Sequence, residues 1–451
     1  MITYSIIKKS ELEGAMRLDA EYYQPEYLKI SNQIKNDDRF ISLSQLNIKC
    51  DASAFYPALE HYYGQEGIPF VRVADVDDGI DYDNILTIPK EILKKYKTLN
   101  TGDAGDIVIT KGGSIARVGL ISRESALTRD LIFFNTSKLN ENDYLFYYIY
   151  CLTNFYKNQL IRSSSMTNQP HLTLTLVRDI PFFNPAKNFR NQIIEIFKKS
   201  QHLLEESKYL YSQAEKLLLE EAGIKNENIK SFNLYSIVNF SDIQKAKRMD
   251  AEYFQNKYGK LVSITDYIFK PLVDVIENVP AKFEPKKESD KQFRYVELSN
   301  INASIGIIDG FSEMLGKDAP GRAKRILKEG DVIVSSVEGS LEKVALVHKE
   351  QKGFLASTGF FQLRSKEILP EVLLIIAKSI IFQSQLKQRC TGTILTAVPK
   401  ESIRDILVPI ISKPIQQKIA ELVRKSHEAR RKAKELLEES KIKVEKLIEN
   451  N

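Results

Sequence analysis

The chain has 451 residues, of which 43% are hydrophobic, 27% charged and 10% aromatic. That length exceeds what one hydrophobic core supports, which excludes a single small domain and favours two or more. The formal net charge is +6, from 65 basic and 59 acidic residues, so charge permits a polyanionic partner but does not require one.

Cysteine usage and hydropathy argue against two further classes of protein. Cys50, Cys151 and Cys390 are far apart and form no C-x-x-C motif, so we expect no zinc or other metal site and no disulfide framework. The N-terminus lacks the apolar core of a signal peptide. The most apolar segment, 371–382, is about half a membrane span long and contains Lys378. We therefore expect a cytoplasmic protein without a membrane partner.

The first distinctive segment in chain order is a box that occurs twice. Residues 17–27 read RLDAEYYQPEY and residues 248–258 read RMDAEYFQNKY, with seven of eleven positions identical. In a helix, Arg17 and Glu21 would form an i, i+4 ion pair, and the second copy would repeat it. No base, metal ligand or phosphate loop recurs beside the boxes. We interpret each box as the join between a globular domain and the long helix of the other half of the chain.

The box is the first of several landmarks that recur in one order. FVRVADV is matched by YVELSNI, GDIVIT by GDVIVS, and GSIARVGLI by GSLEKVALV, all at a nearly constant offset along the chain. Such spacing predicts two copies of one unit. In each copy, β-branched runs separated by Gly and Asp predict strands, and an apolar helix and a last strand follow. The predicted fold class is α+β, with two tandem pseudo-symmetric units that each consist of a mixed α/β domain followed by a long helix.

Each unit ends in a long segment with coiled-coil periodicity. Apolar and small residues recur at alternating steps of four and three in these segments. The expected packing positions are Ile193, Phe197, Ser200, Leu204, Ser207, Tyr211, Ala214, Leu218, Ile419, Val423, Ser426, Ala433, Leu437, Ser440 and Val444. Arg430 is the one residue of the series that breaks the pattern. Small residues recur once per heptad in both segments, so we expect the helices to pair as a close antiparallel coiled coil. Two unrelated amphipathic helices are the alternative.

No motif of a catalytic class is present in the sequence. There is no Walker loop and no G-x-G-x-x-G after a strand. The glycine-rich stretch 111–119 lies between two strand patterns, which favours a hairpin turn over a phosphate cradle. The five histidines do not recur at the repeat offset, whereas a duplicated catalytic site would repeat its base. We expect a non-enzymatic chain with no catalytic residue and no cofactor of its own.

Three motifs resemble the specificity subunit of type I restriction–modification systems, or of related type II- and III-like assemblies. They are the duplicated R-x-D-A-E-Y box, the G-D-[IV] strand followed by a G-S-[IL]-x-[RK]-V turn, and the VPIISKPIQQKIAELV entry into the last helix. The resemblance covers both halves of the chain. It implies target-recognition domains at 1–187 and 226–413, and coiled-coil helices at 188–225 and 414–451.

The same resemblance implies a function and partners. Each domain would read one half of a split, asymmetric target in double-stranded DNA, with the paired helices as a spacer. Two methyltransferase (modification) subunits would dock on this chain, and a restriction or translocase subunit is a further partner in the family. S-adenosylmethionine, and ATP with Mg where a motor is present, would bind to those partner subunits.

The polar loops before the last strand of each unit, and the turns after the G-D-[IV] strands, are the predicted DNA-facing segments. Loops that project from a rigid sheet suit base reading because they can present paired donors and acceptors. The candidate residues are Lys111, Gly113, Ser114, Arg117, Arg162, Ser163, Ser164, Ser165, Asn168, Gln169, His171, Ser335, Ser336, Glu338, Ser340, Lys343, Arg389, Thr391 and Thr393. Glu338 replaces a basic residue of the family's turn, and a carboxylate can accept from the amino group of cytosine. A solvated loop without a partner is the alternative for each loop.

Two other functions remain open at this point. One is a self-contained DNA methyltransferase or nuclease with duplicated recognition domains, although its motifs are missing from the sequence. The other is a coiled-coil scaffold that does not bind DNA. Salt-dependent binding to duplex DNA would exclude the scaffold.

Overall fold

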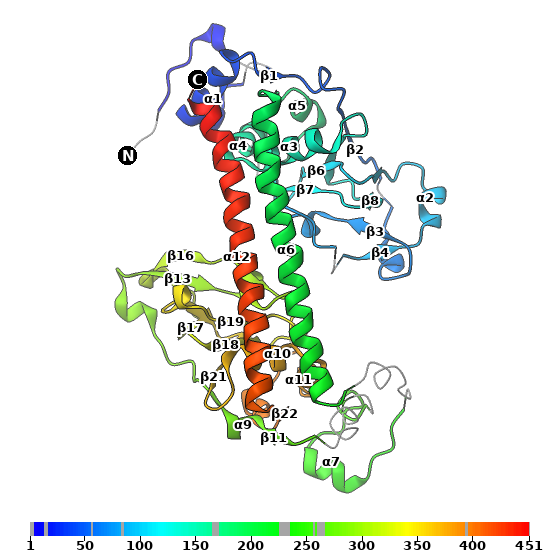
Figure 1. Cartoon of the computed structure of the whole chain (residues 1–451), viewed down its shortest axis with the longest axis vertical. Coiled ribbons are helices and arrows are strands. Elements are labelled where there is room, and N and C mark those ends of the chain that lie inside the picture. Colours follow the sequence, from blue (N-terminus) through cyan, green and yellow to red (C-terminus); the bar gives the residue numbers. More distant parts are fainter. Residues whose placement is uncertain are drawn as a thin grey trace. The chain divides into compact units, whose positions relative to one another are not determined.

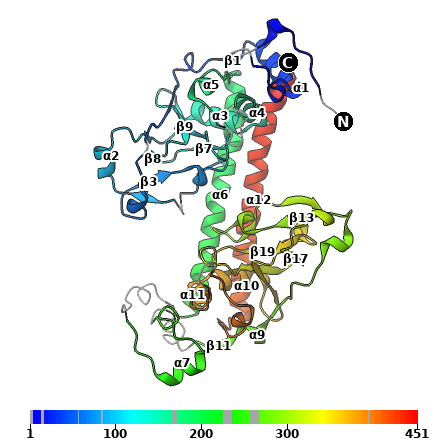
Figure 2. The same ribbon diagram turned by 180° about the vertical axis from the view of Figure 1, so that it is seen from behind.

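The computed structural model describes residues 4–12, 17–55, 57–82, 85–164, 171–224, 235–255, 258, 267–392 and 396–450. The chain divides into two compact units: unit 1 is Met1–Gln201 with Ala433–Asn451, and unit 2 is His202–Lys432. Both units combine sheets with helices, which confirms the expectation of a mixed α and β fold. Figures 1 and 2 show the elements of each unit from opposite sides.

Unit 1 contains two four-stranded sheets. One is antiparallel with the order β2-β9-β6-β7, and the other has the order β4-β3-β8-β5, in which β3 and β8 are parallel. Their strands are β2 (Lys49–Ala52), β3 (Ile68–Val71), β4 (Thr87–Ile88), β5 (Thr101–Gly102), β6 (Ile107–Thr110), β7 (Val118–Leu120), β8 (Ser125–Leu127) and β9 (Leu131–Asn135). A separate pair joins β1 (Phe40–Ile41) to β10 (Phe182–Phe183). All four residues of β6 are buried, as its β-branched run predicts, and β6 and β7 form the expected hairpin.

The core of unit 1 is centred on helix α3 (Glu141–Leu152). Asn140 caps the helix by accepting from the Asp143 amide over 3.0 Å, and the residues from Leu145 to Leu152 are all buried. They pack with β6 and with Ile193 and Phe197 of α6 (Lys187–Glu221). The buried aromatic side chains of α3 are therefore core residues. The other helices are α1 (Pro25–Lys35), α2 (Glu91–Lys95), α4 (Asn154–Ser163), α5 (Leu174–Arg178), and the 3-10 turns η1 (Lys9–Glu11), η2 (Ala20–Tyr23), η3 (Glu60–Tyr62) and η4 (Val73–Asp75).

Unit 2 repeats the strand orders of unit 1 and extends one of them. Its larger sheet has the order β12-β21-β18-β19-β15-β14, whose first four strands correspond to β2-β9-β6-β7, and its smaller sheet has the order β16-β13-β20-β17. The strands are β12 (Ile276–Asn278), β13 (Gln292–Val296), β14 (Ile301–Asn302), β15 (Ile307–Ile308), β16 (Ser312–Leu315), β17 (Ala323–Ile326), β18 (Asp331–Ser335), β19 (Val344–Leu346), β20 (Leu355–Ser357) and β21 (Phe360–Ser365). As in unit 1, two outlying strands pair, β11 (Phe269–Pro271) with β22 (Leu407–Pro409).

Two helices follow β21 in unit 2, as α3 and α4 follow β9 in unit 1. Helix α10 (Pro370–Lys378) is almost wholly buried, and α11 (Ile380–Gln388) begins one residue after Ser379, which caps it. The remaining helices and 3-10 turns are α7 (Phe240–Ala246), α9 (Leu272–Val275), η6 (Pro285–Glu288), η7 (Leu298–Asn300), η8 (Gly316–Asp318), η9 (Lys349–Gln351), η10 (Lys400–Ile403) and α12 (Lys413–Glu449).

The long helices α6 and α12 meet through small residues. In unit 1, Ser200 Oγ donates to the Ala433 carbonyl oxygen over 2.7 Å. In unit 2, Ser426 Oγ donates to the Ser207 carbonyl oxygen over 2.7 Å. Of the expected packing positions, Leu204 and Leu437 are half-buried and the others are buried. Arg430, which breaks the series, binds Asp309 over 3.4 Å within unit 2.

The duplicated boxes do not form the predicted i, i+4 ion pairs, and that prediction is wrong. Arg17 instead binds Asp19, with 2.9 and 2.6 Å between guanidinium and carboxylate atoms, and Arg248 binds Asp250 over 2.8 and 2.9 Å. The backbone at Asp19 is extended, with φ −71° and ψ 127°, which places side chains two residues apart on the same side of the chain. Pro25 begins helix α1, a position that suits proline because the amide there has no partner within the helix.

None of the helices among the described residues has both the length and the apolar character that a membrane crossing needs.

Candidate nucleic-acid interface

In each unit the structure brings together the two segments that the sequence predicts to face DNA. In unit 1, a backbone bridge joins Gly112 to His171, and the Leu172 amide donates to the Lys111 oxygen over 2.9 Å. We call the turn at 111–117, with the chain at His171 against it, loop pair 1.

Unit 2 contains the same arrangement. A bridge joins Val337 to Ala397, and the Val398 amide donates to the Ser336 oxygen over 2.8 Å. These positions are the repeat equivalents of those in unit 1. We call the turn at 336–343, with the chain at Ala397 against it, loop pair 2.

Each turn is held from inside by the last residue of its strand. Thr110 Oγ1, at the end of β6, donates to the Ser114 oxygen, and Ser335 Oγ, at the end of β18, lies 3.1 Å from Ser340 Oγ. The tips are Gly113 and Gly339, with φ of +72° and +81° and open space around their α-carbons. The turns therefore project backbone and short side chains from a fixed base.

The predicted DNA-facing residues differ in how far they reach solvent. Those that are exposed are Gly113, Ser114, His171, Glu338 and Thr391, and those that are half-buried are Lys111, Arg117, Ser163, Ser336, Ser340, Lys343 and Arg389. Ser165, Asn168, Gln169 and Thr393 lie outside the described residues.

Three of the predictions are wrong because the side chains are turned inward. Arg162 is 8% exposed; its Nε donates to the Tyr22 oxygen over 2.9 Å, and Nη1 donates to Ser31 Oγ. Ser164 and Ser335 are also buried, and Ser164 Oγ donates to the Ile161 oxygen. Side chains committed to internal acceptors do not face a duplex.

Two further cations are engaged within unit 2. Lys343 Nζ donates to the Ile301 oxygen over 3.0 Å, and Arg389 donates to the Gln385 and Asp405 oxygens over 2.9 and 3.3 Å. Burial lowers the pKa of the Arg389 guanidinium below its ordinary value. Of the predicted residues, Lys111, Arg117 and the exposed residues are thus the better placed to contact DNA.

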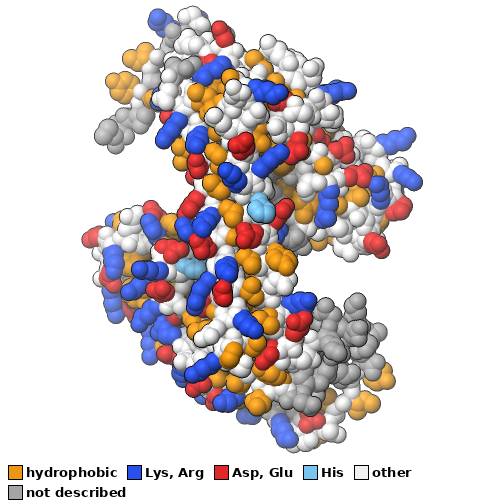
Figure 3. Space-filling view, viewed as in Figure 1, with side chains coloured by type: hydrophobic (Ala, Val, Ile, Leu, Met, Phe, Trp, Pro, Cys, Tyr) orange, Lys and Arg blue, Asp and Glu red, His pale blue; other side chains and the backbone are white. Residues whose placement is uncertain are grey.

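The structure also reveals basic segments that sequence reasoning missed. The connection from β4 to β5 carries four exposed lysines: Lys90, Lys94, Lys95 and Lys97. The corresponding connection from β16 to β17 carries two exposed cations, Lys317 and Arg322, and a third, Lys324, is exposed within β17. Lys and Arg side chains gather over the β13–β17 region in Figure 3. The string KEILKKYK, half lysine, was the signal that could have drawn attention to this connection.

The described residues assemble no catalytic constellation. Among them, no three His, Cys, Asp or Glu side chains are grouped as metal ligands. Burial raises the pKa of Cys50 to about 12 and that of Cys390 to about 11, and holds the pKa of Cys151 well above its ordinary value, so the thiols stay protonated.

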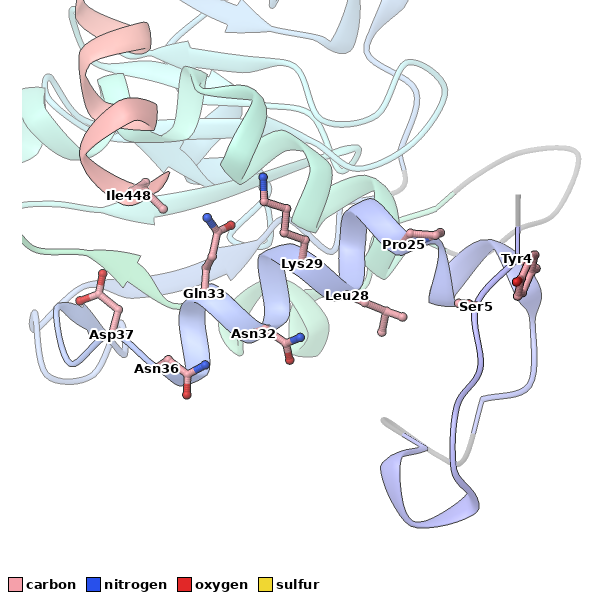
Figure 4. Close-up of a pocket in the computed structure, with 10 residues that line it drawn as sticks. All are labelled: Tyr4, Ser5, Pro25, Leu28, Lys29, Asn32, Gln33, Asn36, Asp37 and Ile448. Atoms are coloured by element: carbon pink, nitrogen blue, oxygen red, sulfur yellow. The ribbon is translucent and has the colours of Figure 1, made fainter. Parts of the chain in front are cut away.

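A hollow of about 560 Å³ lies beside α1 in unit 1 (Figure 4). Its lining combines Lys29 and the amides of Asn32, Gln33 and Asn36 with Ile448. Ser5, which also lines it, donates its hydroxyl to the Tyr23 oxygen. The hollow therefore offers hydrogen-bonding groups but no base paired with a nucleophile.

Comparison with known proteins identifies the class of domain. Residues 49–210 match the family described as the type I restriction modification DNA specificity domain. Residues 49–210 of the chain are thus similar to a type I restriction–modification specificity domain. The resemblance inferred from the sequence is thus confirmed. The matched range includes loop pair 1 and the start of α6.

Individual relatives of this specificity domain are known. Over 158 residues the chain is 27% identical to the type I restriction enzyme MjaIX specificity subunit of Methanocaldococcus jannaschii, a match that covers 34% of this chain and 36% of that protein. It is 30% identical to the HsdS subunit of Thermoanaerobacter tengcongensis, with a TM-score of 0.31, over 34% of this chain and 40% of the other. The matched part thus spans less than half the length of each of these two relatives.

Another solved structure aligns with nearly the whole chain. The S subunit of a type I restriction–modification system from M. genitalium is 14% identical to it, with a TM-score of 0.37. The match covers 92% of this chain and 97% of the other.

Proposed function

We propose that this protein is the DNA sequence-recognition subunit of a restriction–modification complex. The observation that carries the proposal is the loop pair, which occurs in both units on the same strand order, beside a matched specificity domain. In this proposal residues 1–187 and 226–413 are two pseudo-symmetric recognition domains. They read the two halves of a split duplex target.

The two loop pairs carry different polar side chains, which favours an asymmetric target. Loop pair 1 presents Lys111, Ser114 and His171, whereas loop pair 2 presents Glu338 and Thr391. A basic group suits guanine or a phosphate, and a carboxylate suits the amino group of cytosine. The exposed cations of the β4–β5 and β16–β17 connections would add phosphate contacts that hold the register but read no base.

The helices α6 and α12 would form the spacer as an antiparallel coiled coil. From the Ser200–Ala433 bond to the Ser207–Ser426 bond, α6 advances by seven residues while α12 goes back by seven. That register supports an antiparallel pair with small residues at one position of each heptad. Thirty paired helical residues span about 45 Å.

Two methyltransferase subunits would dock on repeated apolar side chains. Tyr4, Ile6 and Leu18 are 78, 85 and 82% exposed, and their counterparts in the second copy of the repeat are equally open. Those counterparts are Tyr235, Ile237 and Met249, at 71, 91 and 84%. Ser5 and Ser236, within the two segments, bind the Tyr23 and Phe254 oxygens. Large apolar residues exposed twice at equivalent positions support two copies of one protein partner.

The proposal gives this chain no catalytic role. S-adenosylmethionine, and ATP with Mg where a translocase subunit is present, would be bound by partner subunits. Incubation with a labelled methyl donor and DNA, alone and with the methyltransferase, tests this: methyl transfer by the chain alone would contradict it.

Spacer length provides the main test of the function. The complex of this chain with its methyltransferase would be bound to duplexes whose half-sites are moved apart by one base pair, a step of about 3.4 Å along the helix. A fixed spacer cannot follow the added rotation, so specific affinity should fall by about tenfold or more. Unchanged affinity would contradict the proposed spacer. Duplex binding that does not weaken with salt would argue against phosphate contacts.

A further inference from the structure

The duplicated box makes the same set of bonds in both units. Besides binding Asp19, Arg17 lies over the Tyr22 ring, with 4.3 Å from its Cζ to the ring centroid. Arg248, bound to Asp250, lies 4.6 Å from the Tyr253 centroid. The carboxylate and the ring together hold each planar guanidinium in one orientation.

Each of these arginines also donates to a backbone oxygen. That oxygen lies just after the helix that precedes the loop pair. Arg17 Nη2 donates to the Ser164 oxygen over 3.4 Å, directly after α4. Arg248 Nη2 donates to the Cys390 oxygen over 3.0 Å, shortly after α11. The two acceptors occupy equivalent positions in the two copies of the repeat.

A second hydrogen bond joins the same two segments, with the helix end as donor and the box as acceptor. It also occurs in both units. Arg162 Nε donates to the Tyr22 oxygen over 2.9 Å, and Gln388 Nε2 donates to the Tyr253 oxygen over 2.9 Å. Arg162 is replaced by Gln388 in the other unit, yet the donor and the backbone acceptor correspond. In both units the box and the end of the helix are thus joined by two hydrogen bonds in opposite directions. We call this pair of hydrogen bonds the clasp.

The clasp and the loop pair hold the chain at two described points in each unit. In unit 1 these points are Ser164, which accepts from Arg17, and His171, which is bridged to Gly112. In unit 2 they are Cys390 and Ala397. The clasp therefore holds the chain close to the residue that completes each loop pair, and a preorganised loop pair sharpens discrimination between bases.

We propose that Arg17 and Arg248 are positioning residues for DNA reading, each acting on one half of the target only. This inference rests on the proposed function. The guanidinium is suited to the task because its planar donors bind a carboxylate and a carbonyl together, which a lysine ammonium does not reproduce. In this proposal the clasp contacts no base itself; it acts through the loop pair, by holding the chain at Ser164 or Cys390.

The test compares Arg17→Lys and Arg248→Lys in the full chain, bound to its methyltransferase. Affinity is measured for the specific duplex, for duplexes with one base pair changed in either half-site, and for unrelated duplex. Arg17→Lys should reduce discrimination in one half-site by roughly tenfold, and Arg248→Lys in the other, because a mismatch is ordinarily discriminated by about that factor or more. Affinity for unrelated duplex should not change.

Arg39→Lys is a matched control within unit 1. Arg39 also binds an aspartate two residues away, Asp37, lies over the Phe183 ring, and donates to a carbonyl, that of Leu447 in α12. It resembles Arg17 in every bond except the acceptor's position. Arg39→Lys should lower the unfolding temperature without altering discrimination in either half-site.

Hydrogen exchange separates failure of this inference from failure of the proposed function. Without DNA, Arg17→Lys should speed exchange of the Ser164 and Leu172 amides and leave Val398 unchanged; Arg248→Lys should do the reverse. If wild-type protein shows no sequence preference, the proposed function fails, and exchange still reports whether the clasp holds the loop. Unchanged exchange, or discrimination that changes equally in both half-sites, would overturn the inference.

Discussion

Ser426 Oγ donates to the Ser207 carbonyl oxygen over 2.7 Å, and the two hydroxyl oxygens lie 3.1 Å apart. Both side chains are buried between α6 and α12. Ser207→Leu would force a larger side chain into this contact and leave the Ser426 hydroxyl crowded, at a cost of about 1–3 kcal/mol. Adding Ala433→Leu should increase the loss. Thermal and urea unfolding would measure both.

Ser207→Ala is the control for that prediction. It removes one hydroxyl without adding volume, so it should cost about 1 kcal/mol, the value of a typical hydrogen bond. If Ser207→Leu is no less stable than Ser207→Ala, the helices do not approach closely at this point.

The buried ring of His427 predicts a pH dependence of unit 2. Nε2 lies 2.8 Å from the Ile305 carbonyl oxygen and must donate to it, while Nδ1 is buried without a partner. Burial, with smaller contributions from nearby His348 and Lys378, lowers the pKa of His427 from 6.5 to about 4. The folded protein therefore takes up a proton less readily than the unfolded chain. The stabilisation is complete above about pH 6.5 and is lost as pH falls toward 4, by about 3 kcal/mol.

His427→Gln tests the origin of that slope. The amide nitrogen of glutamine can still donate to Ile305, but it does not titrate. Urea unfolding of the variant between about pH 4 and pH 6.5 should show a flatter dependence on pH than wild type, with a smaller slope left by His348, whose pKa is also lowered by burial. An equal slope in both proteins would assign the effect to other groups.

The aspartates of the two G-D-[IV] strands predict unequal losses. Asp331 accepts from the Lys328 amide, from Gln362, and twice from Arg364, all within 2.9 Å. Asp331→Ala leaves the Arg364 guanidinium without its carboxylate and leaves Gln362 Nε2 with the Ile326 oxygen as its remaining acceptor, so the free energy of unfolding should fall by about 3–5 kcal/mol.

Asp106, the equivalent residue in unit 1, is the comparison. It accepts from the amides of Asp103 and Thr136 and binds no charged group in the described structure. Asp106→Ala should therefore cost about 1–3 kcal/mol. Urea unfolding measures both variants, and a larger loss for Asp106→Ala would contradict the assignment.

The repeated apolar side chains predict the stoichiometry of the complex. Ile6→Asp and Ile237→Asp should each remove one of two bound methyltransferase subunits, and the double variant should remove both, as measured by sedimentation. Ile268→Asp is the control, because Ile268 is 68% exposed but its repeat position, Arg39, is charged. Retention of two subunits by the double variant would place the docking surface elsewhere.

The repeat and the strand patterns were the informative parts of the sequence. The buried runs in GDIVIT and GDVIVS predicted β6 and β18, and the glycine-rich stretch after the first predicted the hairpin turn. These features follow from local composition and from comparison of the two halves, and both are available without coordinates.

The direction of polar side chains could not be predicted in the same way. Arg162 and Lys111 both belong to polar segments next to strands or helices, yet Arg162 is buried because the Tyr22 oxygen, 140 residues earlier, accepts from it. Likewise, Arg17 binds Asp19 because the backbone at Asp19 is extended rather than helical. Both outcomes depend on tertiary acceptors and on backbone conformation that periodicity does not encode.

The bridge in each loop pair uses backbone atoms alone, so its strength is nearly independent of which side chains flank it. Gly112 and His171 in one unit, and Val337 and Ala397 in the other, make the same pairing with unrelated chemistry. Mutations at these positions therefore carry a low risk of unfolding the protein, provided that they fit the space beside the bridge. If the proposed function holds, the base preference of each half can therefore change by point substitution at these positions while the backbone bridge stays intact.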